Sequence, residues 1–430
     1  MSNTDFPGEL PQEIYDETIG LLRDDPDALR ACALAFRQLL PTSQKLLFKR
    51  LALLLGSRIL SLEYLNGPRL ERILADSPHI GSYVEFLEIS EATDVEAGFN
   101  YTDYSAEQRR ASKYGEYLSR NLTLAFCLPR FCRLKCLSLQ YRHMSGSART
   151  VLENTFRQST LTCINIHSMH PFILQRCRNM KHLSICPLDY DDPPKRTPGI
   201  DRPVLESLHI TLNQRLEVIT FVHTLTEQVI NISHLKKLFV VCKDGALSHA
   251  TLWNLLLGSK TSLEELVFDP CLEAVRHPIA IPRNYLNFGI LKALRRMRIR
   301  LAMTYRPINP ICSMGWFVGI FRTMPLSKEN CLEELTIEVI YKSIMTIDTA
   351  PWSELFTLLA TPDRFPCFKK LRVTILSFRD GQAEEIISDL ESCLIDLRET
   401  GISVELLVAG QGPDYLSTFW PDTSWNSILI

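Results

Sequence analysis

The hexapeptide Leu332-Glu333-Glu334-Leu335-Thr336-Ile337 decides the fold, because its pattern of apolar residues returns along the chain. Close copies begin at Leu134, Leu205 and Leu263. Looser copies begin at Val84, Leu161, Met180, Leu235, Leu294, Phe368 and Val404. A unit this small cannot bury its apolar face alone, so neighbouring units must stack into one continuous core. The pattern therefore predicts a repeat protein.

The segments between the copies predict helices. Apolar residues recur every three or four positions in residues 216–230, 246–257, 314–324, 352–360 and 382–397. Strands on one side and helices on the other predict an α/β fold, an irregular leucine-rich-repeat-like solenoid of horseshoe form, over residues 83–410. Residues 56–82 are expected to form a helical linker or cap. The aromatic residues 411–430 are expected to form a C-terminal cap over the last repeat.

Charge and cysteine usage narrow the class of partner and the compartment. The formal net charge of -2 provides no overall field that would favour nucleic acid or an anionic membrane. The 13 cysteines are odd in number and irregularly spaced, which favours a reducing cytoplasm or nucleus. No apolar stretch approaches the roughly 20 residues that cross a bilayer. We therefore expect neither nucleic acid nor a membrane as partner.

Residues 6–55 do not follow the repeat. They predict three short helices that start near Pro11, Pro26 and Pro41, because proline suits the first helical turn, where its missing N–H would have no partner. Asp25 is expected to cap the second helix. The apolar positions expected to pack are Ile14, Ile19 and Leu22 in the first helix, Leu29, Cys32, Ala33 and Phe36 in the second, and Leu46, Leu47 and Leu51 in the third.

The same segment resembles the F-box family. The motifs that follow the family's order and approximate spacing are Leu10-Pro11-Gln12-Glu13-Ile14, Ile19, Leu22, Leu29, Leu34-Ala35-Phe36-Arg37 and Leu47-Phe48. The chain is similar in particular to the divergent fungal F-box proteins that carry leucine-rich-like repeats. In that family the N-terminal helices dock on the Skp-type adaptor of a cullin ubiquitin ligase, and the repeats select a protein substrate. The resemblance implies an adaptor-binding surface of Leu10, Pro11, Ile14, Ile19, Leu22 and Leu29.

The implied function is that of a non-catalytic substrate-recognition subunit of an SCF-type (Skp–cullin–F-box) ubiquitin ligase. Such a subunit is expected to be a monomer within the hetero-complex, with an unknown protein as substrate. The chain departs from the family at Phe36, where Cys is common, and at Leu39, where Trp is common. An adaptor surface that accommodates an indole would lose contact area at Leu39. The alternative is therefore an interaction scaffold whose F-box is vestigial.

Basic residues gather on two of the later repeats. Side chains that flank the inward apolar positions alternate to the outer face of each strand. The basic residues at these positions are Arg296, Arg298, Arg300, Lys370 and Arg372. They form the candidate substrate-binding face, because arginine forks match carboxylate and phosphate oxygens. In a parallel ladder the arginines could instead pair with acidic residues of the neighbouring strands, namely Glu265, Asp269, Glu334 and Glu338. The earlier repeats have a polar, nearly uncharged outer face.

Two long connections interrupt the repeats. The first lies between Ile89 and Leu134 and contains a charged, helix-like run at residues 106–125. The second, residues 187–195, is rich in proline, which precludes a regular helix or a central strand. Each connection is either a site of partner contact or a solvated loop.

The chain lacks the motifs of common enzyme classes, including the phosphate-binding loop, the Gly-x-Ser-x-Gly elbow and the His-Glu-x-x-His pair. Cys127, Cys132 and Cys136 have no second Cys-x-x-Cys or nearby histidine pair to complete a zinc site. We therefore predict no enzymatic activity, no cofactor and no metal. A hydrolase assembled from residues of different repeats is the remaining catalytic alternative.

Overall fold

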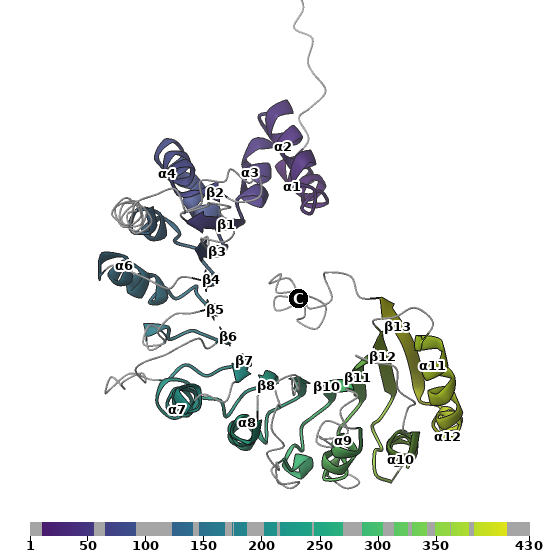
Figure 1. Cartoon of the computed structure of the whole chain (residues 1–430). Helices are drawn as coiled ribbons and strands as arrows, with labels where there is room; N and C mark the ends of the chain where they lie inside the picture. Colours follow the sequence, from purple (N-terminus) through teal and green to yellow (C-terminus); the bar gives the residue numbers. More distant parts are fainter. Residues whose placement is uncertain are drawn as a thin grey trace, which may run out of the picture. The chain divides into compact units, whose positions relative to one another are not determined.

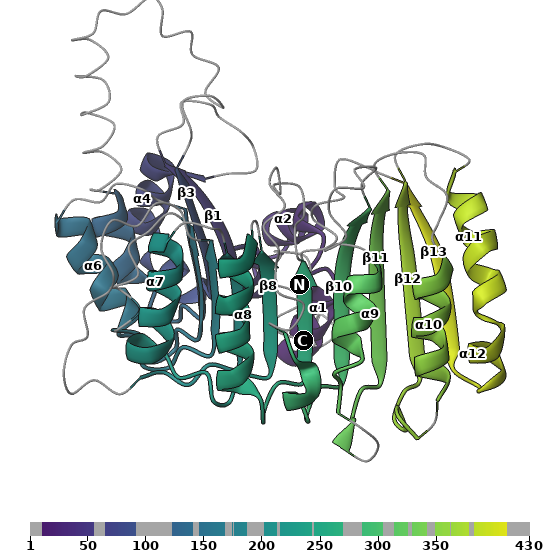
Figure 2. The ribbon, with the colours of Figure 1, turned by 60° about the horizontal axis from the view of Figure 1, so that its bottom comes forward.

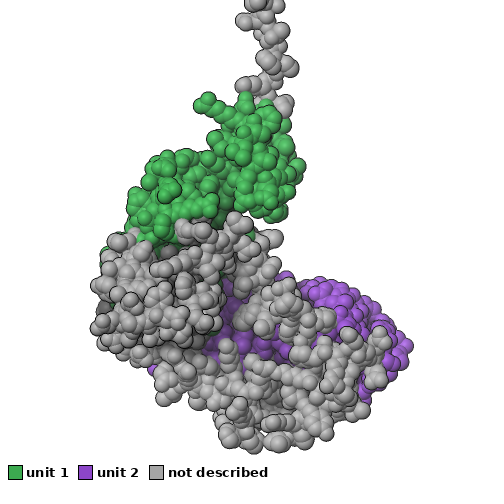
Figure 3. Space-filling view, turned by 45° about the horizontal axis from the view of Figure 1, so that its top comes forward, with its two compact units in different colours: residues 1–188, 195–203 green, residues 189–194, 204–430 purple. Residues whose placement is uncertain are grey.

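The computed structural model describes residues 11–55, 65–91, 123–140, 146–167, 174, 176–186, 202–212, 216–242, 245–269, 286–303, 314–325, 329–341, 349–361, 363–377 and 382–410. The chain divides into two compact units (Figure 3). Unit 1 comprises Met1–Leu188 and Lys195–Pro203, and unit 2 comprises Asp189–Pro194 and Val204–Ile430. Leu10, the connection at 187–195, the aromatic segment at 411–430 and most of the run at 106–125 lie outside the described residues.

Unit 1 begins with the three predicted helices, which are α1 (Gln12–Gly20), α2 (Pro26–Ala35) and α3 (Leu40–Leu47). The prediction that Asp25 caps α2 is confirmed. Its carboxylate accepts hydrogen bonds from the backbone N–H groups of Asp27 and Ala28 at 3.1 and 2.9 Å. The cap satisfies two donors that the first helical turn leaves without a partner.

A polar contact ties α1 to α3 across the helical segment. The Thr42 hydroxyl donates a hydrogen bond to the Asp16 carboxylate, and the Gln12 amide donates a second one at 2.9 Å. These two donors, the hydroxyl first, hold the pKa of Asp16 below its ordinary value. The position of α1 is therefore set by side-chain hydrogen bonds as well as by apolar packing.

The third helix ends at Leu47 and is therefore shorter than predicted, since Leu51 was expected to lie on it. Residues Arg50–Leu55 form a strand instead, β1, which pairs in parallel with β3 (Phe86–Glu91). Leu51, predicted on the helix, lies on this strand and is buried. The extended backbone of β1 forms six residue pairs with β3. A helix at these residues would lose the inter-strand hydrogen bonds of this ladder. The predicted module at 6–55 therefore contributes its last residues to a sheet.

The sheet of unit 1 is parallel wherever its pairing is described. Its strands lie in the order β2 (Leu65–Asn66), β1, β3, β4 (Cys136–Gln140), β5 (Cys163–His167) and β6 (His182–Cys186). The connecting helices and helical turns are α4 (Gly67–Asp76), η1 (Pro78–Tyr83), η3 (Leu128–Arg130) and α6 (Gly146–Phe156). Figure 1 shows α4 and α6 on one side of these strands.

Unit 2 repeats the same arrangement. Its strands lie in the order β7 (Ser207–Leu212), β8 (Lys237–Cys242), β9 (Glu265–Asp269), β10 (Arg296–Met303), β11 (Glu334–Tyr341), β12 (Lys370–Ser377) and β13 (Ser403–Gly410). Its helical segments are α7 (Leu216–Thr224), η5 (Leu225–Val229), α8 (Gly245–Ser259), η7 (Phe288–Ile290), α9 (Met314–Phe321), α10 (Thr349–Ala360), α11 (Gln382–Cys393) and α12 (Ile395–Glu399). Figure 2 shows α9, α10 and α11 along the same face of β10 to β13.

The α/β class and the repeat strands are confirmed. Each of the eleven predicted copies places a strand at its last apolar residues, and the five predicted helices of unit 2 are present. The strand leucines and isoleucines of neighbouring repeats are in register, as Leu335 is with Met297 and Leu371. All three are buried. Stacking in register produces the continuous core that the repeat pattern requires.

A recurring backbone contact sets this register. The carbonyl group just before one strand accepts hydrogen bonds from two successive N–H groups of the next repeat. The Glu264 carbonyl accepts from Arg295 and Arg296 at 2.9 and 3.0 Å. In unit 1 the Glu85 carbonyl does the same for Lys135 and Cys136, at 2.8 and 3.0 Å. The same two donors per carbonyl at successive repeats exclude a slip by one residue.

Charged doublets at these positions alternate in sign from strand to strand in unit 2. The doublets are Lys236-Lys237, Glu264-Glu265, Arg295-Arg296, Glu333-Glu334 and Lys369-Lys370. Ion pairs join Arg296 to Glu265 at 3.3 Å, and Glu333 to both Arg295 and Lys369 at 3.4 and 3.3 Å. The doublet of each repeat therefore lies beside doublets of opposite charge. Pairing of strands whose doublets have the same sign would place like charges side by side.

We expect Glu333→Lys to destabilise unit 2 by about 1–2 kcal/mol, because two ion pairs are replaced by two like-charge contacts. Urea denaturation at low ionic strength measures this loss, and most of it should disappear in 1 M salt, where screening acts over about 3 Å. Glu333→Gln is the matched control and should cost less than Glu333→Lys. An equal loss in both variants at low salt would contradict the role of the alternating charges.

Candidate functional site

Two surfaces contain the residues predicted to contact partners. One is the surface of helices α1 to α3 in unit 1. The other is the outer face of strands β9 to β13 in unit 2, defined by the side chains that alternate with the buried apolar positions. Each surface belongs to a single unit, so its geometry can be described within that unit.

The helical surface differs from the predicted adaptor-binding set. Ile19 and Leu29 are fully buried at the centre of the helices, so the folded segment does not present them to a partner. Leu22 is half-buried, whereas Pro11 and Ile14 are exposed. The surface that the resemblance implies thus combines core residues with surface residues, because both classes are apolar and recur at helical spacing.

Three apolar side chains that the predicted set omitted are exposed instead. Leu34 is 89% exposed, Leu21 is 83% exposed, and Phe36 is also exposed. Phe36 was predicted to pack in the apolar stripe of α2. The helix ends at Ala35, and Phe36 has an extended backbone, with φ -137° and ψ 125°. The turn in the backbone takes its side chain away from the stripe.

The exposed apolar side chains are a candidate docking surface, which we call the helical patch: Ile14, Leu21, Leu34 and Phe36. Exposed leucines occur singly on most proteins. Four within the 23 residues from Ile14 to Phe36, which include α2 and most of α1, are a larger exposure. A signal for Leu34 was present in the sequence, because Leu34 falls outside the stripe of Leu29, Cys32 and Ala33.

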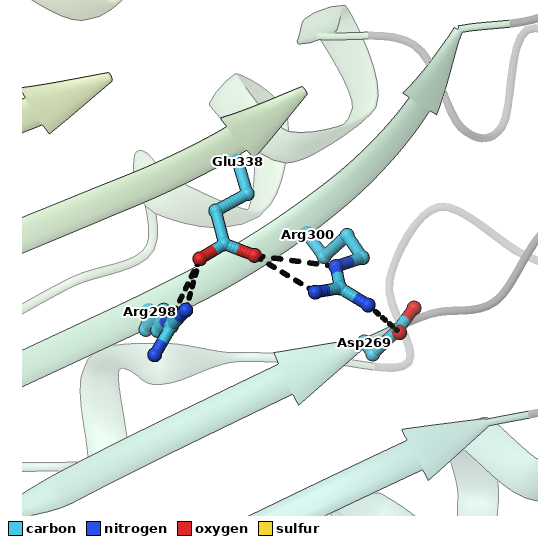
Figure 4. Close-up of polar contacts among 4 residues, drawn as sticks. All are labelled: Asp269, Arg298, Arg300 and Glu338. Carbon is cyan, nitrogen blue, oxygen red and sulfur yellow. Dashed lines mark hydrogen bonds and ion pairs between the residues drawn. The ribbon is translucent and has the colours of Figure 1, made fainter. Parts of the chain in front are cut away.

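The strand face of unit 2 brings the predicted arginines together with acidic residues. Glu338 lies between Arg298 and Arg300 (Figure 4). Arg300 donates to one Glu338 oxygen through Nε and Nη2 at 3.2 and 3.1 Å, and Arg298 Nε donates to the other oxygen at 2.8 Å. Arg300 also lies 3.6 Å from the Asp269 carboxylate. The side chains of Arg300 and Glu338 are only 5% and 8% exposed.

The remaining basic residues of this face also have acidic neighbours. Arg296 pairs with Glu265. Lys370 and Arg372 both contact the Glu405 carboxylate, at 2.6 and 2.7 Å. Hydrogen bonds from Lys370 and then Arg372 hold the pKa of Glu405 below its ordinary value. A lowered pKa means that this carboxylate favours the folded state above its unfolded-state pKa, and that the contribution is lost as the pH falls through the folded-state pKa.

The lateral pairing predicted as the alternative to ligand capture is therefore present in unit 2. Each of the five candidate residues, Arg296, Arg298, Arg300, Lys370 and Arg372, lies within ion-pair distance of a carboxylate. A ligand would have to displace one of these carboxylates to bind the Arg300 guanidinium, which is 5% exposed and contacts both Glu338 and Asp269. Capture of an acidic peptide by this face stays a prediction.

In unit 1, the outer face of β4 and β5 carries cysteines and uncharged polar residues in place of charges. Cys136 and Cys163 lie side by side in register on β4 and β5, and both are buried. In the next row, the Asn165 amide donates to the Ser138 hydroxyl at 3.2 Å. Burial raises the pKa of the Cys136 thiol well above its ordinary value, and it raises the pKa of Cys127 to about 12. Protonated thiols are poor nucleophiles, so neither has the character of a catalytic cysteine.

Within the described parts of the chain, no group of three or more His, Cys, Asp and Glu side chains is arranged to hold a metal ion. No described helix is both long enough and apolar enough to cross a bilayer. Neither a protein-family model nor a curated protein matches the chain. The functional interpretation therefore rests on the residues themselves.

Proposed function

We propose that this protein is the non-catalytic substrate-recognition subunit of an SCF-type ubiquitin ligase. In this proposal α1 to α3 bind a Skp-type adaptor, and the repeats bind a protein substrate. The observation that carries it is the helical patch, which exposes Leu34, Leu21 and Phe36 on a short helical segment ahead of the parallel-strand repeats. Large apolar side chains left in water on a small segment are typical of a docking surface.

The mechanism in this proposal is proximity. A substrate held by the repeats has its lysines close to the ubiquitin-conjugating enzyme that the cullin recruits. Tethering raises the effective concentration of the lysine, and this chain supplies no reacting group. The high pKa of the buried thiols is consistent with a receptor that does no covalent chemistry itself.

The finer description of the fold belongs to the same proposal. Residues 12–47 would be an F-box-like module, and the strands with their connecting helices would be an irregular leucine-rich-repeat-like solenoid of horseshoe form. The alternation of parallel strands and helices within each unit supports this description. A cytoplasmic or nuclear location follows from the proposed ligase role and from the cysteine usage.

A binding experiment with a purified Skp-type adaptor tests the proposal. The full chain is expected to bind, and Leu34→Ala with Phe36→Ala should weaken binding by about 10- to 100-fold, because exposed apolar anchors dominate such interfaces. Leu257→Ala is the matched control, since Leu257 is an exposed leucine on α8 of unit 2. The affinity of the Leu257→Ala variant for the adaptor should equal that of the wild type.

The alternative, an interaction scaffold with a vestigial module, has one specific observation in its favour. Leu39 is half-buried at the start of α3, at the position where the family commonly has Trp. A folded wild-type chain that does not bind the adaptor would favour the scaffold and reject the ligase proposal. Equal binding by the wild type and the Leu34/Phe36 variant would reject the helical patch as the docking surface.

A further inference from the structure

The sheet of unit 2 ends in an open edge at β13. Among the described strands, β13 pairs only with β12, so one side of its backbone has no strand partner there. Edge strands of natural proteins are commonly short or carry proline or lysine, which prevent pairing with another chain. β13 has eight residues and contains no proline, lysine or arginine. In unit 1, by contrast, β2 has only two residues.

The inward face of β13 also lacks the cover that β12 has. The inward residues form three pairs in register with β12, which are Val404 with Leu371, Leu406 with Val373, and Val408 with Ile375. The three β12 side chains are fully buried, whereas Val404 and Leu406 are half-buried and Val408 is 50% exposed. Positions that belong to the core in the other repeats therefore reach solvent at this edge.

We propose that β13 is a dimerisation edge, on which β13 of a second copy of this chain pairs antiparallel about a two-fold axis at Leu406. The inward side chains are symmetric about that position, since Leu406 has a valine two residues away on each side. The axis places Leu406 opposite Leu406 of the second copy, and Val404 opposite Val408 of the second copy. The pairing thus brings together the three inward side chains of each copy. It also supplies inter-strand hydrogen bonds to the free edge of β13 in both copies.

Charge on the outward face is compatible with this pairing. The two-fold axis places Glu405 opposite Leu407 of the second copy, so the two glutamates do not face each other. Glu405 is already paired with Lys370 and Arg372 of its own chain. No like-charge pair therefore arises within the paired strands.

The symmetry of the inward residues favours a second copy over other occupants. An unrelated strand, or residues 411–430 of the same chain, would not need equal valines on both sides of Leu406. An isologous interface is also closed, so the product is a dimer and not a filament. This inference differs from the monomer expected from the sequence, and it is independent of adaptor binding by α1 to α3.

Analytical ultracentrifugation of the full chain over a wide concentration range tests the proposal. A reversible equilibrium between monomer and dimer is expected. Val408→Lys should raise the dimer dissociation constant by about 100-fold or more, because each dimer would bury two unpaired charges. Val204→Lys is the matched control, since Val204 is a valine of unit 2 that is 43% exposed away from β13, and it should leave the dissociation constant unchanged.

A second variant keeps the test decisive if the lysine variant does not fold. Leu406→Cys is a milder change that places two thiols at the axis, so oxidation by dissolved oxygen should link the copies by a disulfide at position 406, beyond any crosslink that exposed native cysteines such as Cys132 and Cys367 give in the wild type under the same oxidation. Absence of this crosslink in a folded variant would overturn the proposal. A full chain that stays monomeric, grows beyond a dimer, or dimerises equally well as Val408→Lys would overturn it too. A chain that dimerises only when truncated after Gly410 would assign the edge to residues 411–430.

Discussion

Glu338→Leu is expected to destabilise unit 2 by about 3–5 kcal/mol, because it leaves a buried charge without its partner. The carboxylate is nearly buried and contacts both Arg298 and Arg300. Its removal leaves the Arg300 guanidinium, which is 5% exposed, without its closest counter-charge. Removing one partner of a buried ion pair costs far more than the pair itself contributes, because the remaining charge stays desolvated.

Tryptophan fluorescence during urea denaturation measures this effect selectively, because all five tryptophans lie in unit 2. Glu334→Leu is the matched control, since Glu334 lies on the same strand and face but is exposed. It should cost less than about 1 kcal/mol. Similar losses in the two variants would show that the burial of Glu338 has no energetic consequence.

Ile19→Ala and Leu29→Ala are each expected to destabilise the helices α1 to α3 by about 2–5 kcal/mol, because both side chains are fully buried and truncation leaves a cavity. Hydrogen exchange of peptides within residues 12–47, followed by mass spectrometry, measures the local loss of protection. Adaptor binding should fall in these variants only as far as the helices unfold.

Leu34→Ala supplies the contrast, because Leu34 is 89% exposed and truncation should change stability by less than about 0.5 kcal/mol. Hydrogen exchange should remain that of the wild type while the adaptor affinity falls. If Leu34→Ala unfolds the helices, or if Ile19→Ala leaves their protection intact, then the division between core and surface described for this segment is wrong.

Much of the fold could be predicted from local patterns. The strands of unit 2 follow directly from phrases such as Leu332 to Ile337, because inward positions alternate within one short segment. Helix α2 likewise follows from Asp25 and Pro26, which act on the adjacent turn. These features depend on residues only a few positions apart, so the sequence displays them directly.

Strand β1 could not be predicted in this way. Residues 50–55 contain leucines at a spacing that fits the end of a helix as well as a strand. The choice was made by β3, which lies more than 30 residues later and offers a complete parallel ladder. The pairing with β3 outweighs the local helical propensity of residues 50–55, because the backbone N–H and C=O groups at the edge of β3 need hydrogen-bond partners.

The candidate surfaces divide along the same line. The sequence by itself determined which residues are apolar, which are charged and where each repeat strand runs, because those properties are local. Only the tertiary structure decided that Ile19 is core while Leu34 is exposed, and that Arg300 is bound to Glu338, 38 residues away in the chain. Burial and ion pairing depend on which segments lie side by side, and distant segments meet only when the core is assembled.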